Sequence, residues 1–364
     1  MARDSAGRVI FIPHSAPGDR VKARIRWTEK RYAQAEIIEI EEASSIRIAP
    51  RCSVFGQCGG CQWQHLPYEL QWKTKSQGVR YALQRASVPV PESWQEFPAE
   101  HAWGYRNRIQ LRGEGQEIGF FRSGTRERVP ARRCEIAREE INSSWEEVRV
   151  EGSRHSGQYK VELEVLESGE VRRTWNARHG AAGFRQIHDE QNQRLQDFVY
   201  QVYSKPIEEG APCNLLDLYG GSGNLSRALS AATDSIASII CVDTSIPQAM
   251  DWTPPPHFQF QKSAVLPWLL RRAQAQPSSP ERPCRALVDP PREGLGRELA
   301  EVASALNRLD TRELIAIGCD PDSWARDLSG WTRKGWKIAK AAVFDFFPQT
   351  PHVESVAVLV RTAR

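Results

Sequence analysis

A short apolar run followed by a glycine-rich loop and a helix constrains the fold of this chain more than any other stretch. Residues 214–219 are predicted to form a strand, residues 220–223 a tight glycine loop, and residues 224–232 a helix. This order is the first unit of a doubly wound α/β sheet, in which ligands bind at the carboxyl ends of the strands. Such a loop also occurs as a plain connection, so it predicts the fold more firmly than a ligand.

Other apolar runs in the carboxyl-terminal half of the chain border on acidic residues. The run that begins at residue 238 ends in Asp243, about twenty residues beyond the glycine loop, where an acid can bind ribose hydroxyls. Another run ends in Asp289, and Glu354 precedes the last one. A lone acid in such a position is often a helix cap or a turn residue. Because the strand ends of this fold share one edge, the sequence predicts that the three acids form one constellation there.

Cys319 directly follows the apolar residues 314–317 and a glycine, and an Asp-Pro turn follows it. The run is predicted to be a buried strand that delivers the thiol to the same edge of the sheet. A thiol there can act as a nucleophile if a neighbouring group lowers its pKa or removes its proton. A lone cysteine is more often a buried structural residue. The acids expected around Cys319 favour the catalytic interpretation.

Three cysteines lie close together in the amino-terminal half, and a fourth lies far downstream. Cys52, Cys58 and Cys61 are separated by five and then two residues, with glycines between them that let the backbone wrap closely around a small group. Together with Cys134 they form a soft set of four thiolates that suits zinc or an iron–sulfur cluster. Zinc ribbons usually show two C-x2-C pairs, so this asymmetric pattern favours a cluster.

Arginines and aromatic residues are interleaved between residues 101 and 134. The arginines are Arg106, Arg108, Arg112, Arg122, Arg126, Arg128, Arg132 and Arg133, and the aromatic residues are Trp103, Tyr105, Phe120 and Phe121. This combination suits unpaired bases and phosphates. A charged β-surface over an aromatic core would have the same composition. Residues 147–183 are predicted to add further strands to this domain.

Residues 7–40 are predicted to form three short strands of a small β-barrel. In the second strand cations alternate with apolar residues: Arg20, Lys22, Arg24 and Arg26 on one face, and Val21, Ala23, Ile25 and Trp27 on the other. A period of two places the apolar set beneath the cations. Such a row of cations suits a phosphate backbone, although a solvated charged face would show the same pattern.

Composition excludes several classes of protein. The 364 residues are enough for two or three domains, and 40% hydrophobic with 26% charged residues indicate a packed globular protein. There is no apolar run of about 18 residues and no apolar secretory core at the start, so we expect a cytoplasmic protein without a membrane partner. Eight cysteines without a signal favour metal binding or catalysis over disulfides. We expect a monomer.

These motifs together resemble the 5-methyluridine (uracil-C5) RNA methyltransferase family over nearly the whole chain. The resemblance rests on the barrel, the cysteine motif up to Lys73, the glycine loop, the Asp-Pro-Pro-Arg motif at 289–292, the Cys-Asp-Pro turn and His-Val-Glu at 352–354. It implies three domains: 1–47, a TRAM-like (OB-like) RNA-binding β-barrel; 48–183, a β-rich central domain with an iron–sulfur cluster and a basic RNA surface; and 184–364, a Rossmann-like methyltransferase domain.

The resemblance also implies the site residues. A 4Fe-4S cluster would be held by Cys52, Cys58, Cys61 and Cys134. S-adenosyl-L-methionine would be contacted by Gln186, Tyr219, Asn224, Asp243 and Asp289. Cys319 would be the nucleophile and Glu354 the base.

The implied reaction is methylation of uracil C5 in RNA, closest to the family members that act on 23S ribosomal RNA. A thiolate attacks C6 so that C5 can take the methyl group, and a carboxylate then removes the C5 proton. The target base must leave its stack to reach the thiol. A transfer RNA uracil is an alternative target, and a catalytically silent RNA-binding or assembly protein is an alternative function. The presence of both Cys319 and Glu354 favours the enzyme. Cytosine methylation would commonly place a cysteine where Asp289 stands.

Overall fold

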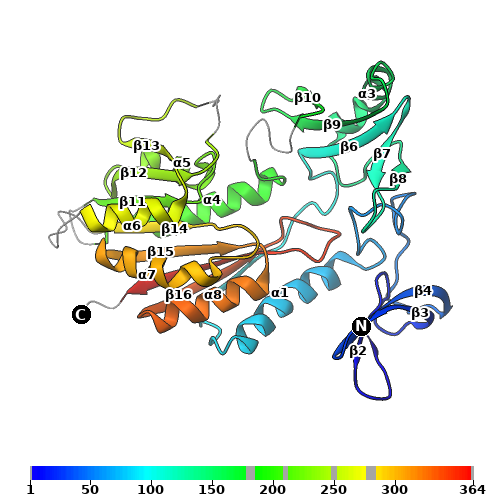
Figure 1. Ribbon diagram of the computed structural model, residues 1–364, viewed down its shortest axis with the longest axis horizontal. Helices are drawn as coiled ribbons and strands as arrows, with labels where there is room; N and C mark the ends of the chain where they lie inside the picture. The colour runs from blue at the N-terminus through cyan, green and yellow to red at the C-terminus, as the bar shows by residue number, and fades with distance from the viewer. Residues whose placement is uncertain (1, 178–184, 208–211, 247–251, 276–283, 362–364) are drawn as a thin grey trace. The chain divides into compact units, whose positions relative to one another are not determined.

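The computed structural model describes residues 2–177, 185–207, 212–246, 252–275 and 284–361, which divide into two compact units (Figure 1). The first unit comprises Met1–Thr74, His101–Ala177 and Phe347–Pro351; the second comprises Lys75–Glu100, Arg178–Phe346 and His352–Arg364. Residues 75–100, expected in the central domain, belong to the second unit because β5 (Trp94–Phe97) pairs with β16 (Trp336–Phe344). The predicted boundary between residues 183 and 184 lies outside the described residues.

The second unit is built on a mixed sheet that confirms the predicted Rossmann-like α/β fold. Its order across the described strands is β13 (Phe258–Lys262), β12 (Ile236–Asp243), β11 (Cys213–Leu218), β14 (Cys284–Val288), β15 (Thr311–Gly318), β17 (Glu354–Arg361), β16 and β5. The strands from β13 to β15 are parallel, whereas β17 is antiparallel to both of its neighbours. All five residues of β14 are buried, as expected for a central strand covered on both faces.

Helices cover this sheet, and they are α1 (Tyr68–Arg85), α4 (Asp189–Tyr203), α5 (Asn224–Ala228), α6 (Val265–Ala275), α7 (Leu299–Arg308) and α8 (Pro321–Arg333). Helices α6, α7 and α8 pack one after another, and α4 packs against α5 (Figure 1). The helix predicted over 224–232 is shorter, because a 3-10 turn, η1 (Leu229–Ala231), replaces its second half. None of the described helices is both long enough and apolar enough to cross a membrane.

A buried arginine fastens the end of α4 to the sheet. Arg285 on β14 is 1% exposed and donates hydrogen bonds to the carbonyl oxygens of Tyr203 and Lys205, each over 2.6 Å. Its Nε also donates to Glu313 on β15 over 2.8 Å. A guanidinium is tolerated in this position because its charge is paired with Glu313 and each of its three nitrogens donates a hydrogen bond.

The amino-terminal part of the first unit is an open sheet of strands β1 (Ala2–Arg3), β2 (Val9–Phe11), β4 (Tyr32–Glu42) and β3 (Arg20–Thr28), in that order. The predicted strands therefore form. The prediction that Ile25 and Trp27 lie beneath the cations is wrong, because they are 46% and 45% exposed. They lie near the end of the edge strand β3, where Trp27 contacts the ring of Tyr32 on β4 but stays partly open to solvent.

The cations of β3 face acids of β4. The strand register places Arg20 opposite Glu42, Lys22 opposite Glu39, and Arg24 opposite Glu36. Cross-strand pairs of opposite charge stabilise a sheet by about 0.2–1 kcal/mol each. The acids of β4 also offset the positive charge of the row of cations that the sequence predicts.

The rest of the first unit is an antiparallel sheet of β10 (Val171–Trp175), β9 (Gln158–Val165), β6 (Arg108–Glu114), β7 (Glu117–Phe121) and β8 (Arg128–Pro130). Helices α2 (Glu139–Ser143) and α3 (Trp145–Gly152) pack on it through Ile141, Trp145 and Val148. Arg108, predicted to belong to a basic surface, is buried and pairs with Glu164 over 2.8 Å. That part of the prediction is wrong because acids on the neighbouring strand β9 draw this arginine inside.

Candidate active site

Three predicted site residues meet at one edge of the eight-stranded sheet. Asp289 follows β14, Cys319 follows β15, and Glu354 begins β17. Gly318 pairs with Ser355, so Cys319 and Glu354 occupy adjacent strand ends. This arrangement agrees with the rule that functional groups of open α/β sheets gather where the strands end.

Burial and two neighbouring carboxyl groups keep the thiol protonated. Burial, then Glu354 and Asp289, raise the pKa of Cys319 to about 11. Burial, together with Asp289, raises the pKa of Glu354 well above its ordinary value. Burial and Asp217 raise the pKa of Asp289 to about 7. Because like charges crowd a site of low polarity, protons are bound more tightly here than in water.

A cation opposes this effect. Arg292 lowers the pKa of Cys319, and its Nε lies 3.6 Å from the Asp320 carboxylate. Asp320 caps α8 by accepting hydrogen bonds from the backbone amides of Asp322 and Ser323, over 3.2 and 3.0 Å. The negative charge next to Cys319 in the sequence is thus offset by a helix amino terminus and an arginine.

Replacing Arg292 with alanine should raise the pKa of Cys319 and slow its alkylation by iodoacetamide at a fixed pH, because the thiolate loses its neighbouring cation. The Arg292 side chain is 62% exposed. Solvent screening should therefore limit the change in rate to roughly a few-fold. Mass spectrometry of the Cys319 peptide across alkaline pH measures the profile, with Arg292→Lys as the control that keeps the charge. An unchanged profile in Arg292→Ala would contradict the role assigned to this cation.

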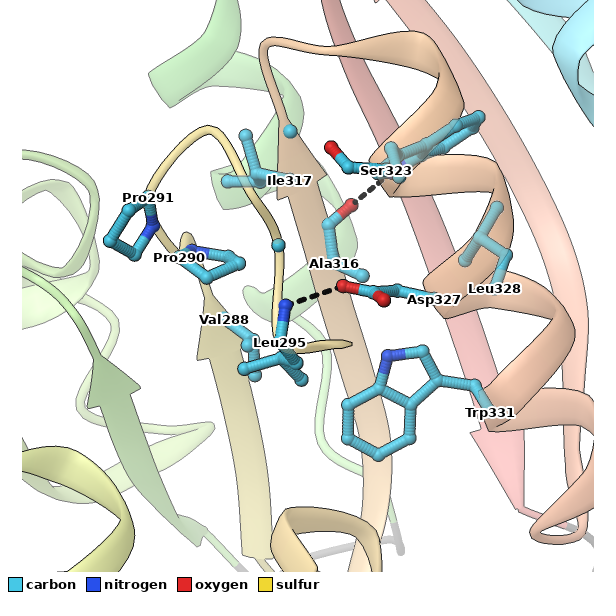
Figure 2. A pocket seen from close by; sticks show the side chains of 13 residues that line it. Val288, Pro290, Pro291, Leu295, Ala316, Ile317, Ser323, Asp327, Leu328 and Trp331 are labelled. Carbon is cyan, nitrogen blue, oxygen red and sulfur yellow. Dashed lines mark hydrogen bonds between the residues drawn. The ribbon is translucent and has the colours of Figure 1, made fainter. Parts of the chain in front are cut away.

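One face of α8 holds the loop that carries Arg292. Ser323 Oγ donates to the Arg292 carbonyl over 2.8 Å, and Arg326 Nη2 donates to the Glu293 carbonyl over 2.5 Å. Asp327 accepts from the amides of Leu295 and Gly296, over 2.5 and 3.3 Å. Figure 2 shows the Asp327 carboxylate turned toward Leu295. The same helix therefore places Cys319 at its start and positions the Arg292 loop along its side.

The contact between this loop and α8 leaves almost no free space. Gly294 has φ +71°, and a Cβ there would lie 2.3 Å from Asp327 Oδ2. The cavity between residues 288–295 and α8, whose lining side chains Figure 2 shows, has a volume of about 20 Å³. That is room for about one water molecule, so it is a packing void rather than a ligand site.

The glycine loop after β11 lies between two acids. A Cβ on Gly220 would stand 2.4 Å from Asp217 Oδ2, and Asp243 accepts from the amide of Gly221 over 3.1 Å. Burial raises the pKa of Asp217 to about 6, and Ser226 donates a hydrogen bond to its carboxylate. Gly221 has φ +56°, and no atom lies within 4 Å of the place where its Cβ would be. The loop thus packs against Asp217 at Gly220, and at Gly221 it is open to the space at the edge of the sheet.

The remaining predicted cofactor residues lie around this loop. Asn224 begins α5, donates to Asn192 over 2.7 Å and accepts from Gln196 on α4. Tyr219 has φ +64° and donates to Glu298 over 3.5 Å. Gln186 is half-buried and lies shortly before α4. All three belong to the unit that carries Cys319, and their contacts with a cofactor remain predictions.

The four predicted metal ligands gather in the first unit. Burial raises the pKa of Cys61 to about 12, and Cys134 and Cys58 add to the rise; Cys52 in turn raises the pKa of Cys58 after burial. These mutual effects show that the sulfurs lie near one another. Two side chains hold the surrounding backbone, since Gln64 accepts from the Cys52 amide over 3.1 Å and Asn142 from the Cys134 amide over 2.9 Å.

Comparison with known proteins places these observations in a class. The strand order, the glycine loop after β11 and the acids at the strand ends define a Rossmann-like fold of the S-adenosylmethionine-dependent methyltransferases. A solved structure, Pyrococcus abyssi tRNA (uracil-54, C5)-methyltransferase in complex with S-adenosyl-L-homocysteine, has this fold, with a TM-score of 0.66 and 20% identity. The match covers 96% of this chain and 95% of that one.

Two segments of the chain match known families. Residues 283–362 match the tRNA (Uracil-5-)-methyltransferase family and residues 1–38 match the TRAM domain, and the sequence predicts both resemblances. An uncharacterized RNA methyltransferase of Bdellovibrio bacteriovorus is 28% identical, with 97% of this chain and 90% of that protein covered. The 23S rRNA (uracil(1939)-C(5))-methyltransferase of Haemophilus influenzae is 25% identical, with 97% of this chain and 91% of that protein covered.

Proposed function

We propose that this protein methylates C5 of uracil in RNA, with S-adenosylmethionine as the methyl donor and 23S ribosomal RNA as the substrate. The observation that carries the proposal is the meeting of Cys319, Glu354 and Asp289 at one strand edge, within the sheet that also carries the glycine loop. A binding protein has no need of a thiol between two carboxyl groups. The Haemophilus relative acts on uracil of 23S rRNA, which supports the choice of substrate.

The residues around the glycine loop fit the methyl donor. The open position at Gly221 leaves room at the sheet edge, and Asp243 stands where an acid binds ribose hydroxyls. We assign Gln186, Tyr219, Asn224 and Asp289 to the remainder of that pocket. When bound, S-adenosylmethionine supplies an electrophilic methyl group.

The two reacting side chains act at different times. Cys319 Sγ, as a thiolate, forms a bond to C6 and drives electron density to C5. After C5 has gained the methyl group, the Glu354 carboxylate removes the C5 proton, and the Cys319–C6 bond breaks. Both groups must lose a proton before they act, and Arg292 favours that loss at Cys319.

The substrate is tested by mass spectrometry of ribosomal and transfer RNA from a deletion strain. We expect one methyluridine to be missing from 23S rRNA. Loss from transfer RNA alone would support the second candidate, which the fold shared with the Pyrococcus tRNA enzyme favours. Loss from neither would contradict the enzyme and leave a role in RNA binding. We expect the protein to act in the cytoplasm as a monomer.

We also propose that Cys52, Cys58, Cys61 and Cys134 hold a 4Fe-4S cluster. Arg106 lowers the pKa of Cys58, Cys61 and Cys134, and its buried Nε has no hydrogen-bond partner among the described residues. Such a donor suits the sulfide of a negatively charged cluster.

Protein purified without air should be brown and contain about four irons per chain. Cys134→Ser should lower the iron content and the melting temperature, because a cluster held by three thiolates is lost more readily. Cys284→Ser is the matched control, since this buried thiol lies in the second unit. One zinc per chain without iron would contradict the cluster.

Because acids of β4 face the cations of β3, we expect these cations to contribute less to RNA binding than the sequence alone predicts. Changing Lys22, Arg24 and Arg26 together to alanine should flatten the salt dependence of RNA binding by less than the roughly three units that three free phosphate contacts would give. The reason is that Glu36 pairs with Arg26 over 2.5 Å and lies 3.9 Å from Arg24. Fluorescence anisotropy over a range of salt concentrations measures the slope. A change of three full units would mean that RNA displaces these acids.

A further inference from the structure

A hollow of about 370 Å³ on the five-stranded sheet of the first unit is not used by the mechanism above. Its volume lies in the range of sites for small ligands. Its lining residues include no acid. They comprise four cations, two aromatic residues, two amide side chains and a glycine, and the argument uses Arg112, Arg126, Arg128, Lys160 and Phe121. Strands β6, β7, β8 and β9 and the β7–β8 turn contribute them, so the sheet brings together residues far apart in the sequence.

The four cations of the hollow differ in whether another side chain already pairs with them. Arg128 pairs with Glu114 over 3.0 Å, and Arg112 donates to Gln110 over 2.7 Å. Arg126 and Lys160, by contrast, make no side-chain ion pair with any described residue. The hollow therefore carries uncompensated positive charge, which suits a phosphate group.

Phe121 gives the hollow an accessible aromatic surface. The Tyr159 ring points to the opposite, helix-covered face of the sheet, where it packs in the core and lies 2.2 Å from the place where a Cβ on Gly113 would be. Phe121 is 37% exposed, and the Arg112 guanidinium lies 5.0 Å from its ring centroid. An exposed ring beside a guanidinium is the surface on which an unpaired base stacks.

We propose that this hollow binds one nucleotide of a single-stranded RNA segment, with the phosphate between Arg126 and Lys160 and the base against Phe121. The proposal rests on RNA being the substrate and adds a site outside the catalytic unit. A base enters such a hollow only when it is not stacked in a duplex, so single strands are selected. The neighbouring cations Arg112 and Arg128 strengthen the attraction for the backbone.

The test compares Phe121→Leu, Arg126→Ala and Lys160→Ala in binding a labelled oligouridylate of about ten nucleotides and a duplex of the same length. Phe121→Leu should weaken single-strand binding about five-fold or more and leave the salt slope unchanged, because it removes stacking and no charge. Each cation change should weaken binding several-fold and reduce the slope by about one unit. Duplex binding should change little in Phe121→Leu.

A matched control is Arg154→Ala, which removes an exposed cation of the same unit that does not line the hollow. It should leave single-strand binding as in the wild type. Phe121→Leu keeps the backbone bond from the Gly59 amide to the Phe121 carbonyl, so the fold is retained, and circular dichroism checks this. The proposal is overturned if Phe121→Leu binds single strands like the wild type, or if Arg154→Ala weakens binding as much as Arg126→Ala.

The proposal that the hollow binds a nucleotide and the proposal that the protein is a methyltransferase can fail independently, and the measurements distinguish the two cases. If the deletion strain loses no methyluridine while the three variants bind single strands weakly, the hollow stands without the enzyme. If methylation is found, the variants should raise the KM for RNA and keep kcat at saturating RNA. Methylation with unchanged KM and unchanged binding in all three variants would refute the hollow alone.

Discussion

Cys319→Ala should lower uracil methylation by roughly 10⁴-fold or more and abolish every covalent RNA–protein species, because the thiolate forms the first bond of the reaction. Incorporation of a labelled methyl group measures the first effect, and a denaturing gel measures the second. Cys284→Ser should retain activity, since this thiol lies at the opposite end of the sheet, where β14 begins. Normal methylation by Cys319→Ala would refute the assignment of the nucleophile.

Glu354→Gln should have the reverse effect on the covalent species. The amide cannot accept the C5 proton, so addition and methyl transfer proceed and the adduct between Cys319 and the methylated uridine accumulates. Wild-type protein should give the same retarded band with RNA that carries 5-fluorouridine at the target, because fluorine does not leave as a cation. In both cases the band should require S-adenosylmethionine. A Glu354→Gln protein that turns over normally would exclude this carboxylate as the base.

Asp327→Ala should reduce kcat by roughly 10²-fold although Asp327 touches no reacting atom. The change removes the acceptor of the Leu295 and Gly296 amides, and each buried donor left without a partner costs about 1–3 kcal/mol. The loop should shift to find new partners and carry Arg292 with it. A displacement of about 1 Å at a site of this kind can lower the rate by about that factor.

A merely structural role for Asp327 would change stability and leave the thiol untouched. We therefore expect the alkylation profile of Cys319 in Asp327→Ala to move to higher pH, as in Arg292→Ala. Asp327→Asn keeps one acceptor oxygen and should recover part of the activity. Asp322→Ala removes an exposed acid from the same helix and serves as the control. Lost activity together with an unchanged alkylation profile would show that Asp327 does not position the Arg292 loop.

The strands that frame the active site could be predicted because each is a short apolar run between turn residues. β11, β12, β14, β15 and β17 are mostly buried, and burial makes such runs conspicuous. β5, β13 and part of β16 are half-exposed and mix charged with apolar residues, so the sequence does not predict them. Their place in the sheet depends on pairing with strands distant in the sequence.

The reacting groups could be predicted for a related reason, since strand ends of one sheet share an edge. Asp327 could not, because its role depends on the backbone amides of a loop that precedes it by about thirty residues. Its spacing from Ser323 and Arg326, on one face of an expected helix, was the only local signal. The sequence predicts a surface position for Arg106 and Arg108, because composition does not show that Arg106 interacts with Tyr105 and the thiols, or that Arg108 pairs with Glu164.

The double role of α8 also limits which changes of length the chain tolerates. Adding or deleting one residue between Cys319 and Ser323 would turn the remainder of the helix by about 100° and shift it by about 1.5 Å relative to the thiol. Ser323, Arg326 and Asp327 would then face away from the Arg292 loop even with every side chain retained. The number of residues from Cys319 to Asp327 must therefore stay fixed for the loop to be held. We expect single-residue insertions there to lower activity as much as loss of Asp327, whereas insertions after Arg333 should be tolerated.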